Sequence, residues 1–311
     1  MKIGYPCINR SLARSETSTF RLASYSEDRL IKTSNNNLVH LSKILNYNIE
    51  NHLLFFRISS DLIPFASHPI CKYNWLTHFK SEFKEIGDYI TKNNIRISMH
   101  PDQFVLINSP HEKVTQNSIR ELQYHCDILD AMCLDRSAKI QIHVGGAYGE
   151  KTNAIKTFIR RYDTFLSESI KERLVIKNDD HLFNLNDCMN IHQETSIPIV
   201  FDNFHHVCFS DGESLDDSIK KSNSTWKKAK DGPPIMDYSS QQLGERKGKH
   251  VNTIDISLFE KFVLTLKDFN ADIMLEYVRI KDKEKSALKA FEIVKTYSNP
   301  LNLKANTFDR C

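Results

Sequence analysis

The sequence lacks long apolar segments, paired cysteines and a strong excess of charge of either sign. No run of about 18 apolar residues occurs in the chain, so we expect no transmembrane helix. Its first residues, MKIGYPCINRS, do not include the apolar stretch of a secretory signal peptide. The seven cysteines form no CxxC pair, which is typical of a protein of the reducing cytoplasm. These absences favour a cytoplasmic protein that does not contact a membrane.

Glycine is also scarce, with nine residues in the chain. Two of them, Gly145 and Gly146, stand together just after a strand-like run, where they would let the backbone approach a ligand closely. A tight turn that serves no ligand is an equally good interpretation.

The net charge of +3 excludes a histone-like polycation but permits a local basic surface. The candidates are WKKAK (226–230) and ERKGKH (245–250), although a single basic run is more often an ordinary solvated surface. Two stretches with little pattern, 10–34 and 206–233, are expected to be long loops of the binding surface.

Eight short apolar runs each end at or near a polar residue. The runs are KIGY, LLFFRISS, IRISMH, KIQIH, RLVIK, IPIVFD, PPIMDY and DIMLE, and they deliver Tyr5, Ser59, His100, His143, Lys177, Asp202, Asp237 and Glu276. Eight strand–helix units predict an α/β protein, a (β/α)8 TIM barrel, in which functional residues gather at the C-terminal ends of the strands. The 311 residues fit one such barrel, so we expect a single domain over residues 1–311, in which the last dozen residues could form a tail.

Helical patterns separate most of these runs. The segment 109–133 predicts a helix with Ser109 and Glu112 as a capping box and Pro110 at the first position. Apolar residues between positions 76 and 90 recur at helical spacing and predict another helix.

Histidine and carboxylate side chains dominate the strand ends, and they are ligands that suit Zn²⁺, Mn²⁺ or Fe²⁺. One histidine at a strand end is more often structural, but the barrel would direct all of these side chains to one axis. The sequence therefore predicts a metal centre of His100, His143, Asp202, His205, His250 and Glu276. Two or three metal ions close together would form a clamp for phosphoryl displacement, in which one ion activates water and another stabilises the leaving oxygen.

Several other polar residues are weaker candidates. Taken alone, His68 and the pair Tyr5 and Asn9 would be structural or loop residues. Asp179 and Asp180 could be ligands, but an acidic pair after a strand more often caps the next helix.

A series of segments from Lys2 to about Lys295 carries a more specific signal. The segments are GYPCIN, RISSDLIPFASHP, SMHPDQFVLINSP, IHVGGAYGEK, LVIKNDD, FDNFHH, DYSSQ, GKHVNTID, and DIMLE with KDKEKSALK. Together they resemble the UV damage endonuclease family of DNA repair enzymes, which is related in fold to endonuclease IV and sugar isomerases. The resemblance implies an enzyme that nicks UV-damaged double-stranded DNA on the 5′ side of pyrimidine photodimers, with abasic sites as further candidate lesions.

The resemblance also implies a cofactor and its ligands. Family members hold up to three metal ions, usually Mn²⁺, with Zn²⁺ or Mg²⁺ as alternatives, and we expect a monomer. Carried over by motif, the metal ligands are His68, His100, His143, Asp202, His205, His250 and Glu276.

Contacts to DNA follow from the same resemblance. Gln103 and Phe104 correspond to the pair that wedges into the duplex at the lesion, although the apolar run FVLI would by itself make Phe104 a core residue. Tyr5 and Asn9 would contact the flipped bases or the phosphate near the cut.

Three positions depart from the family pattern. Many members end the fifth strand in a metal-bridging glutamate, where this chain has Lys177. Many also carry Pro-Lys-x-His on strand 7, often with a carboxylated lysine, where this chain has Ile235 and Asp237; the aspartate is still a competent metal ligand. A protonated lysine about 4 Å from a divalent ion is repelled by roughly 8 kcal/mol at an effective dielectric constant of about 20. Lys177 must therefore be neutral, turned away or carboxylated, or else it indicates that one metal ion is missing.

Three functions remain open on these grounds. The first is a metal-dependent repair endonuclease, with Tyr5, Asn9, Lys177 and Glu276 as candidate catalytic residues. The second is a damage-binding protein that has lost catalysis through Lys177. The third is a metal-dependent sugar isomerase or epimerase on the same barrel, which would need a small closed pocket and leaves the HPDQF segment without a role.

Overall fold

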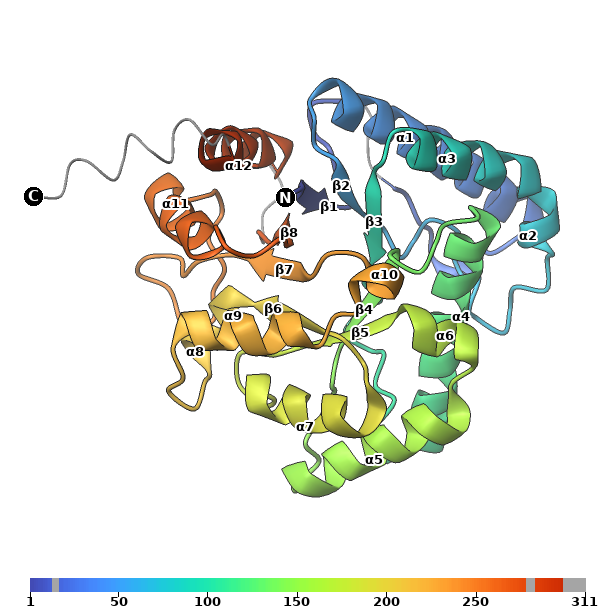
Figure 1. The fold of residues 1–311 in the computed structure, drawn as a ribbon. Helices are drawn as coiled ribbons and strands as arrows, with labels where there is room; N and C mark the ends of the chain where they lie inside the picture. Colours follow the sequence, from blue (N-terminus) through green and yellow to red (C-terminus); the bar gives the residue numbers. More distant parts are fainter. Residues whose placement is uncertain (13–16, 278–282, 299–311) are drawn as a thin grey trace, which may run out of the picture.

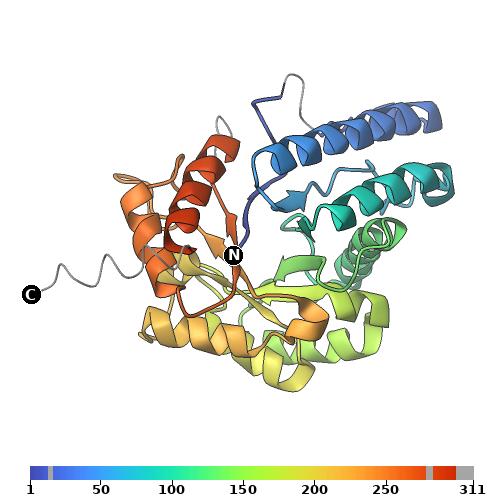
Figure 2. The same cartoon turned by 45° about the horizontal axis from the view of Figure 1, so that its top comes forward.

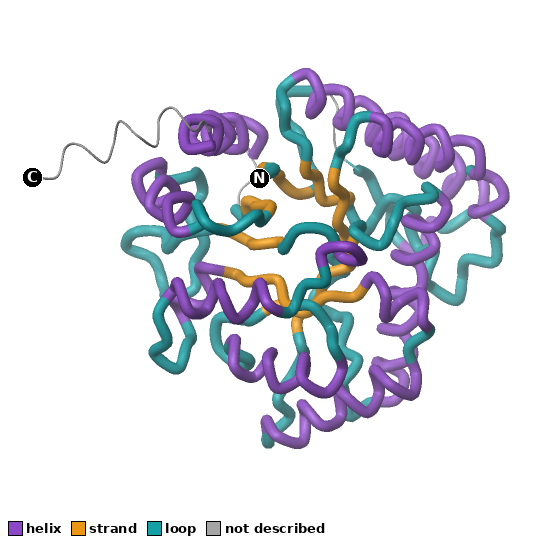
Figure 3. Tube along the Cα trace, in the orientation of Figure 1, coloured by secondary structure: helices purple, strands orange, loops and turns teal. Residues whose placement is uncertain are grey.

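Eight parallel strands close into a barrel, which confirms the predicted (β/α)8 fold. The computed structural model describes residues 1–12, 17–277 and 283–298, so the predicted C-terminal tail lies outside the described residues. The strands are β1 (Ile3–Pro6), β2 (Phe55–Ile58), β3 (Arg96–Met99), β4 (Lys139–His143), β5 (Leu174–Lys177), β6 (Ile199–Asp202), β7 (Ile235–Tyr238) and β8 (Asp272–Leu275). Each strand pairs with the next, and β8 pairs with β1 to close the barrel. Figure 3 shows the strands gathered at the centre, with helices around them.

The helices form the outer layer of the barrel (Figures 1 and 2). They are η1 (Leu22–Ser24), α1 (Glu27–Glu50), α2 (Trp75–His78), α3 (Lys80–Lys92), α4 (Glu112–Ala131), α5 (Lys151–Phe165), α6 (Glu168–Arg173), α7 (Leu185–Thr195), α8 (Asn203–Cys208), α9 (Leu215–Ser224), α10 (Lys228–Asp231), α11 (Ile256–Thr265) and α12 (Lys283–Ser298). None of the described helices is both long and apolar enough to cross a membrane.

The start of α4 differs from the prediction. The helix begins at Glu112 with His111 as its N-cap, and no side chain caps it. The Ser109 hydroxyl instead accepts a hydrogen bond from the His111 amide at 3.2 Å, which forms a turn before the helix. The predicted capping box is therefore wrong, because Ser109 lies too far from the first helical residue. The helix predicted over 76–90 is interrupted at Phe79, which separates α2 from α3.

The two stretches predicted as loops are partly helical. The side chains of Ser26 and Ser214 accept hydrogen bonds from the Arg29 and Asp217 amides, and these caps start α1 and α9. Only parts of 10–34 and 206–233 are therefore left to form a binding surface.

Side chains of five strands form two successive layers in the barrel interior. In a strand, residues two apart face the same side, so each strand can contribute to both layers. The lower layer is an apolar cluster of Phe55, Val175, Val200, Ile235 and Met274, closed by Trp226. Two residues further along the same chain segments come the charged residues Arg57, Lys177, Asp202, Asp237 and Glu276. Along these five strands, the interior therefore changes from a packed core to a charged centre over two residues.

Trp226 places the WKKAK segment at the N-terminal end of the barrel. Its indole is buried and donates a hydrogen bond to the carbonyl of Ile199, the first residue of β6, at 2.8 Å. The lysines that follow, Lys228 and Lys230, line a cavity of about 770 Å³ together with Arg96 at the start of β3. WKKAK thus lies at the opposite end of the barrel from the histidines, and the prediction that it faces the substrate is wrong. In barrels, this end serves stability more than chemistry.

Candidate metal centre

Four histidines line one cavity at the C-terminal end of the barrel. His100 follows β3, His143 ends β4, His205 lies in α8 directly after β6, and His250 lies in the loop after β7. Their rings form a row, with centroid distances of 5.7 Å from His100 to His143, 5.8 Å from His143 to His205 and 5.5 Å from His205 to His250. All four border a cavity of about 390 Å³. The structure therefore brings together histidines that are up to 150 residues apart in the sequence.

Backbone carbonyls fix the orientation of three of these rings. Nδ1 of His100 donates to the Pro101 carbonyl at 2.7 Å, and Nδ1 of His205 donates to the Asn178 carbonyl at 3.0 Å. Nδ1 of His250 donates to the Glu276 carbonyl at 3.2 Å. A proton on Nδ1 leaves the lone pair on Nε2, which is the usual arrangement of a histidine that ligates a metal.

His143 has an unsatisfied atom in the same row. Its Nδ1 is buried and has no hydrogen-bond partner among the described residues. Burial, followed by the charge of Lys177, lowers the pKa of His143 well below its ordinary value. Burial and the charge of Arg57 lower the pKa of His100 to about 3. Both rings are therefore neutral at physiological pH, as metal binding requires.

Three carboxylates lie below the histidines, and Lys177 lies among them. Its Nζ is 3.0 Å from Oε2 of Glu276, 3.0 Å from Oδ2 of Asp237 and 3.1 Å from Oδ2 of Asp202. The side chain of Lys177 is only 1% exposed. Burial alone would lower the pKa of Lys177, but the charges of Glu276, Asp237 and Asp202 outweigh it and raise the pKa. Of the possibilities that the sequence left open for Lys177, a side chain turned away from the site is wrong, and the raised pKa favours the charged amine over the neutral one.

Arg57 supplies a second buried cation. Its guanidinium bonds Oε1 of Glu276 and lies 3.0 Å from Oδ1 of Asp237. It also donates to Oε1 of Gln141 at 3.0 Å, and the Gln141 amide donates to Asp237. Arg57 and Gln141 were not predicted as site residues, because they lie within the strands and not at the strand ends where functional residues were expected. Polar residues within otherwise apolar strand runs were the available signal.

The two acidic residues nearest the cations respond differently. Burial, followed by the charge of Glu276, raises the pKa of Asp237 to about 6. For Glu276, burial opposes ionisation, but the charges of Lys177 and Arg57 outweigh it and hold its pKa well below the ordinary value. Of the two carboxyl groups, Glu276 is therefore the one that stays ionised over the wider pH range.

Asp202 links the carboxylates to the histidine row. Its Oδ1 accepts hydrogen bonds from the amides of Phe204 and His205, which caps α8. Its Oδ2 lies 3.2 Å from Nδ1 of His205 as well as beside Lys177. Asp202 thus orients His205 and neutralises Lys177.

Histidine nitrogens and acidic oxygens of this kind could hold a metal ion. The four histidines border one cavity and His143 has an orphaned buried nitrogen, so neighbouring histidines of the row could contribute ligands to a divalent cation. Among the described residues, however, no three of these histidines place ring nitrogens within 4.8 Å of one another. Oxygens of Asp202, Asp237 and Glu276 do lie within 4.8 Å of one another, but the Lys177 ammonium contacts all three.

Comparison with known proteins identifies the family. Residues 1–305 match the family model described as UV-endonuclease UvdE. The chain belongs to this family. A UV DNA damage endonuclease of Clostridium perfringens (strain 13 / Type A) is 40% identical over 306 residues, which cover 98% of this chain and 73% of that protein. Another from Bacillus cereus (strain G9842) is 34% identical over 252 residues, which cover 80% of this chain and 79% of that protein.

Solved structures agree with this assignment. The crystal structure of SacUVDE superposes with a TM-score of 0.89 at 44% identity, over 95% of this chain and 98% of that one. Endonuclease IV from Thermus thermophilus has a TM-score of 0.55 at 11% identity, over 83% of this chain and 94% of that one, and shows the shared fold alone. The resemblance to UV damage endonucleases that the sequence predicted is confirmed.

The two residues predicted to wedge into DNA at a lesion lie on the surface in this UvdE chain. Gln103 and Phe104 occupy the loop after β3, and both are exposed. Phe104 is 72% exposed, so the alternative interpretation as a core residue is wrong. Gln103 borders the histidine cavity, whereas Phe104 borders an adjacent cavity of about 650 Å³. A role in lesion binding stays a prediction.

His68 lies apart from the other predicted ligands. It is exposed, it borders the same cavity as Phe104, and its Nδ1 accepts a hydrogen bond from the Ile70 amide at 3.1 Å. The cavity lined by the four other histidines does not have His68 on its wall. Ligation by His68 stays a prediction.

Tyr5 and Asn9 are fully buried. The Tyr5 hydroxyl donates to Asn48 of α1 at 2.6 Å and accepts from the Asn9 amide at 2.8 Å. Tyr5 thus points toward the helical layer and not into the barrel interior. Contacts from these residues to DNA stay a prediction that the side-chain directions do not support.

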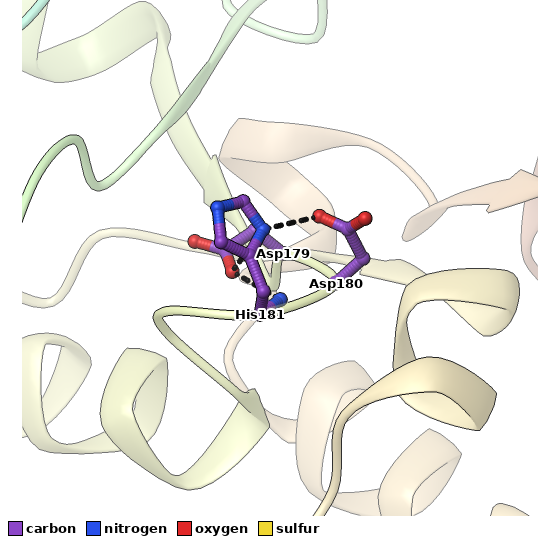
Figure 4. Close-up of side chains that lie close together, drawn as sticks. All are labelled: Asp179, Asp180 and His181. Atoms are coloured by element: carbon purple, nitrogen blue, oxygen red, sulfur yellow. Dashed lines mark hydrogen bonds and ion pairs between the residues drawn. The ribbon is translucent and has the colours of Figure 1, made fainter. Parts of the chain in front are cut away.

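Asp179, Asp180 and His181 form a separate polar group at the edge of the histidine cavity (Figure 4). Oδ1 of Asp179 accepts from the amides of His181 and Phe183, and Asp180 bonds the His181 ring at 2.7 Å. The pair was expected to cap the next helix, but α7 is capped by Asn184. Asp179 instead stabilises the turn between β5 and α7.

The glycine pair accommodates neighbouring side chains. Gly145 has φ +117°, and a Cβ there would lie 2.3 Å from the Asn108 side chain. A Cβ on Gly146 would lie 2.7 Å from the Tyr148 ring. Close packing within the chain therefore explains both glycines.

Proposed function

We propose that the chain is a metal-dependent DNA repair endonuclease that nicks UV-damaged duplex DNA on the 5′ side of pyrimidine photodimers. One observation carries this proposal. Three rings with a fixed Nδ1 and one ring with an orphaned nitrogen border a single cavity, and the exposed Gln103 stands on its wall. The relatives named UV DNA damage endonucleases support the choice of substrate.

The histidines would hold the metal, for which we propose Mn²⁺. A bound divalent ion supplies an activated water and positive charge for the phosphate. The chain's own residues orient the ligands: Asp202 and the Asn178 carbonyl hold His205, and the Glu276 carbonyl holds His250. Lys177 is a poor general base, because three carboxylates retain its proton.

Lesion selection would depend on the loop after β3. A photodimer stacks and pairs poorly, so moving it out of the duplex costs less free energy than moving normal bases. Phe104 offers an exposed ring on which an unpaired base could stack, and Gln103 offers an amide for hydrogen bonds. The two side chains would fill the gap that the photodimer leaves.

A damage-binding protein without catalysis is the second candidate. The ion pairs of Lys177 favour it, because they place a cation where many family members are expected to have a metal-bridging glutamate. A sugar epimerase on the same barrel has less support, since an exposed phenylalanine beside the cavity would have no role.

Nicking of plasmid DNA separates these functions. Supercoiled plasmid, with and without UV irradiation, would be incubated with the chelator-treated protein and added Mn²⁺. We expect irradiated plasmid to relax and unirradiated plasmid to stay supercoiled, with no nicking in the presence of chelator or by His143→Asn. An oligonucleotide with one photodimer then maps the cut. Binding to this oligonucleotide without any cut would favour the damage-binding protein, and a cut on the 3′ side would contradict the proposed position.

A further inference from the structure

Lys177 has the geometry of a fully bonded ammonium. An ammonium has three N–H donors and no acceptor. Each donor of Lys177 has one carboxylate acceptor, at 3.0 Å, 3.0 Å and 3.1 Å, on three different strands or strand ends. A carboxylated lysine would instead direct an anion at three carboxylates. The contacts therefore correspond to a free, protonated amine.

Two buried cations already balance most of the negative charge of the three carboxylates. Asp202, Asp237 and Glu276 contribute three negative charges, while Lys177 and Arg57 contribute two positive charges, which leaves a net charge of −1. These atoms are buried, so solvent screens their interactions only weakly. A divalent ion added among these carboxylates would face two fixed cations that cannot leave without breaking buried ion pairs.

We propose that Lys177 takes the place of a metal ion in this chain, so that the site holds a single divalent ion on the histidine row. The inference rests on the proposed function for its premise that the histidines take up a divalent ion. It goes further, because it assigns a different cation, the ammonium of Lys177, to the three carboxylates of Asp202, Asp237 and Glu276. Arg57 supports this role by neutralising the faces of Glu276 and Asp237 that Lys177 does not contact.

The same geometry gives Lys177 a positioning role. Through Asp202 it is connected to His205, because Oδ2 of Asp202 lies beside both Nζ of Lys177 and Nδ1 of His205. The carbonyl of Glu276 holds His250, while its carboxylate bonds Lys177. The fixed cation thus stabilises two residues that orient metal ligands.

Metal stoichiometry tests the proposal without reference to activity. The chelator-treated full chain would be titrated with Mn²⁺ in a calorimeter, and free Mn²⁺ would be counted by electron paramagnetic resonance. We expect one Mn²⁺ per native chain and a second in Lys177→Glu, where two nearby ions should also show spin–spin coupling. Lys139→Met is the matched control, because Lys139 is an equally buried lysine paired with Asp231 at the other end of the barrel. It should still bind one ion.

Two or three ions in the native chain would overturn the proposal, whether or not any variant folds. One ion in both the native chain and a folded Lys177→Glu variant would also overturn it. A mass increase of one CO₂ on Lys177 in bicarbonate buffer would do the same, since the residue would then be an anion. The proposed function is tested separately. If the chain bound one ion but did not nick irradiated DNA, the proposed function would be wrong and this inference would stand. If it nicked irradiated DNA efficiently with several ions bound, this inference alone would be wrong.

Discussion

Phe55 and Arg57 occupy successive inward positions on β2, and the change from a phenyl ring to a guanidinium marks where the barrel interior becomes a site. Phe55 packs in the apolar cluster with Val175 and Met274. Arg57, one step along the strand, bonds the carboxylates of Asp237 and Glu276. The apolar cluster below keeps water from the ion pairs on that side, which strengthens them.

Glu276 should matter for nicking and not for folding. Glu276→Gln removes the negative charge that pairs with Lys177 and Arg57, while Asp237 still pairs with both cations and Asp202 with Lys177. We expect the nicking rate to fall roughly 10- to 100-fold, as for residues that support metal ligands. Single-turnover nicking of a photodimer oligonucleotide measures this, with circular dichroism as the check on folding.

Asp272→Asn is the matched control for Glu276. Asp272 starts the same strand, is also buried, and pairs with Arg96 at the N-terminal end of the barrel at 2.9 Å. This change should lower the unfolding temperature and leave the single-turnover rate unchanged. If both variants lost the same fraction of activity, Glu276 would have only a general structural role.

The strands could be predicted because parallel strands that are covered on both faces are continuous apolar runs. His100, His143 and Asp202 could be predicted for the same reason, since each ends such a run. Arg57 and Gln141 could not be found by looking at strand ends, although each interrupts an apolar run. Of the two buried cations in the site, the sequence indicated only Lys177, because a lysine is unexpected at a strand end where metal ligands gather. The sequence does not show which carboxylates surround it.

The placement of WKKAK was also predicted wrongly, because it depends on contacts that the sequence does not show directly. The residues of a basic run do not themselves show at which end of the barrel the run lies. Trp226 decides this by packing in the apolar cluster and bonding the Ile199 carbonyl. Two features of the sequence indicated this placement. A buried aromatic residue stands beside the basic run, and the segment leads into the start of β7, which lies at the N-terminal end of the barrel.

Phe104 should contribute to binding of damaged DNA. Stacking of a base on an aromatic side chain contributes about 1–3 kcal/mol, so Phe104→Ala should weaken binding to a photodimer duplex roughly ten- to hundredfold. Binding to undamaged duplex should change much less, because its bases stay stacked. Fluorescence anisotropy with both duplexes measures the difference.

Phe165 provides the control for Phe104. It is an exposed phenylalanine, 44% accessible, at the C-terminal end of α5 and therefore at the other end of the barrel. Phe165→Ala should leave both affinities unchanged. An equal loss on damaged and undamaged DNA in Phe104→Ala would show that Phe104 does not read the lesion.

The basic loop at the C-terminal end should determine the salt dependence of DNA binding. Arg246 and Lys247 are exposed in the segment that leads to His250, and Lys249 is half-buried beside it. Replacing all three with Gln should reduce the slope of log affinity against log salt by about 0.9 for each phosphate that the variant no longer neutralises. The equal change in charge at Lys227, Lys228 and Lys230 should not alter the slope, because these residues lie at the other end. A larger effect from the second triple variant would contradict this placement of the DNA.

The chain should lose stability in acid partly through His100. Its pKa in the folded chain is lowered to about 3, first by burial and then by Arg57 and Lys177, against an ordinary value of 6.5. The unfolded chain therefore takes up a proton on this ring at pH values where the folded chain does not. The contribution of His100 to stability is complete above pH 6.5 and is lost as the pH falls toward 3. At about pH 4.5 the loss from this residue, relative to about pH 7, should be about 2.5 kcal/mol. Urea unfolding of the metal-free protein at about pH 7 and pH 4.5 measures it, and His100→Gln should lose that much less than the native chain. Equal losses in the two proteins would mean that this ring accepts a proton as readily in the folded chain as in the unfolded one.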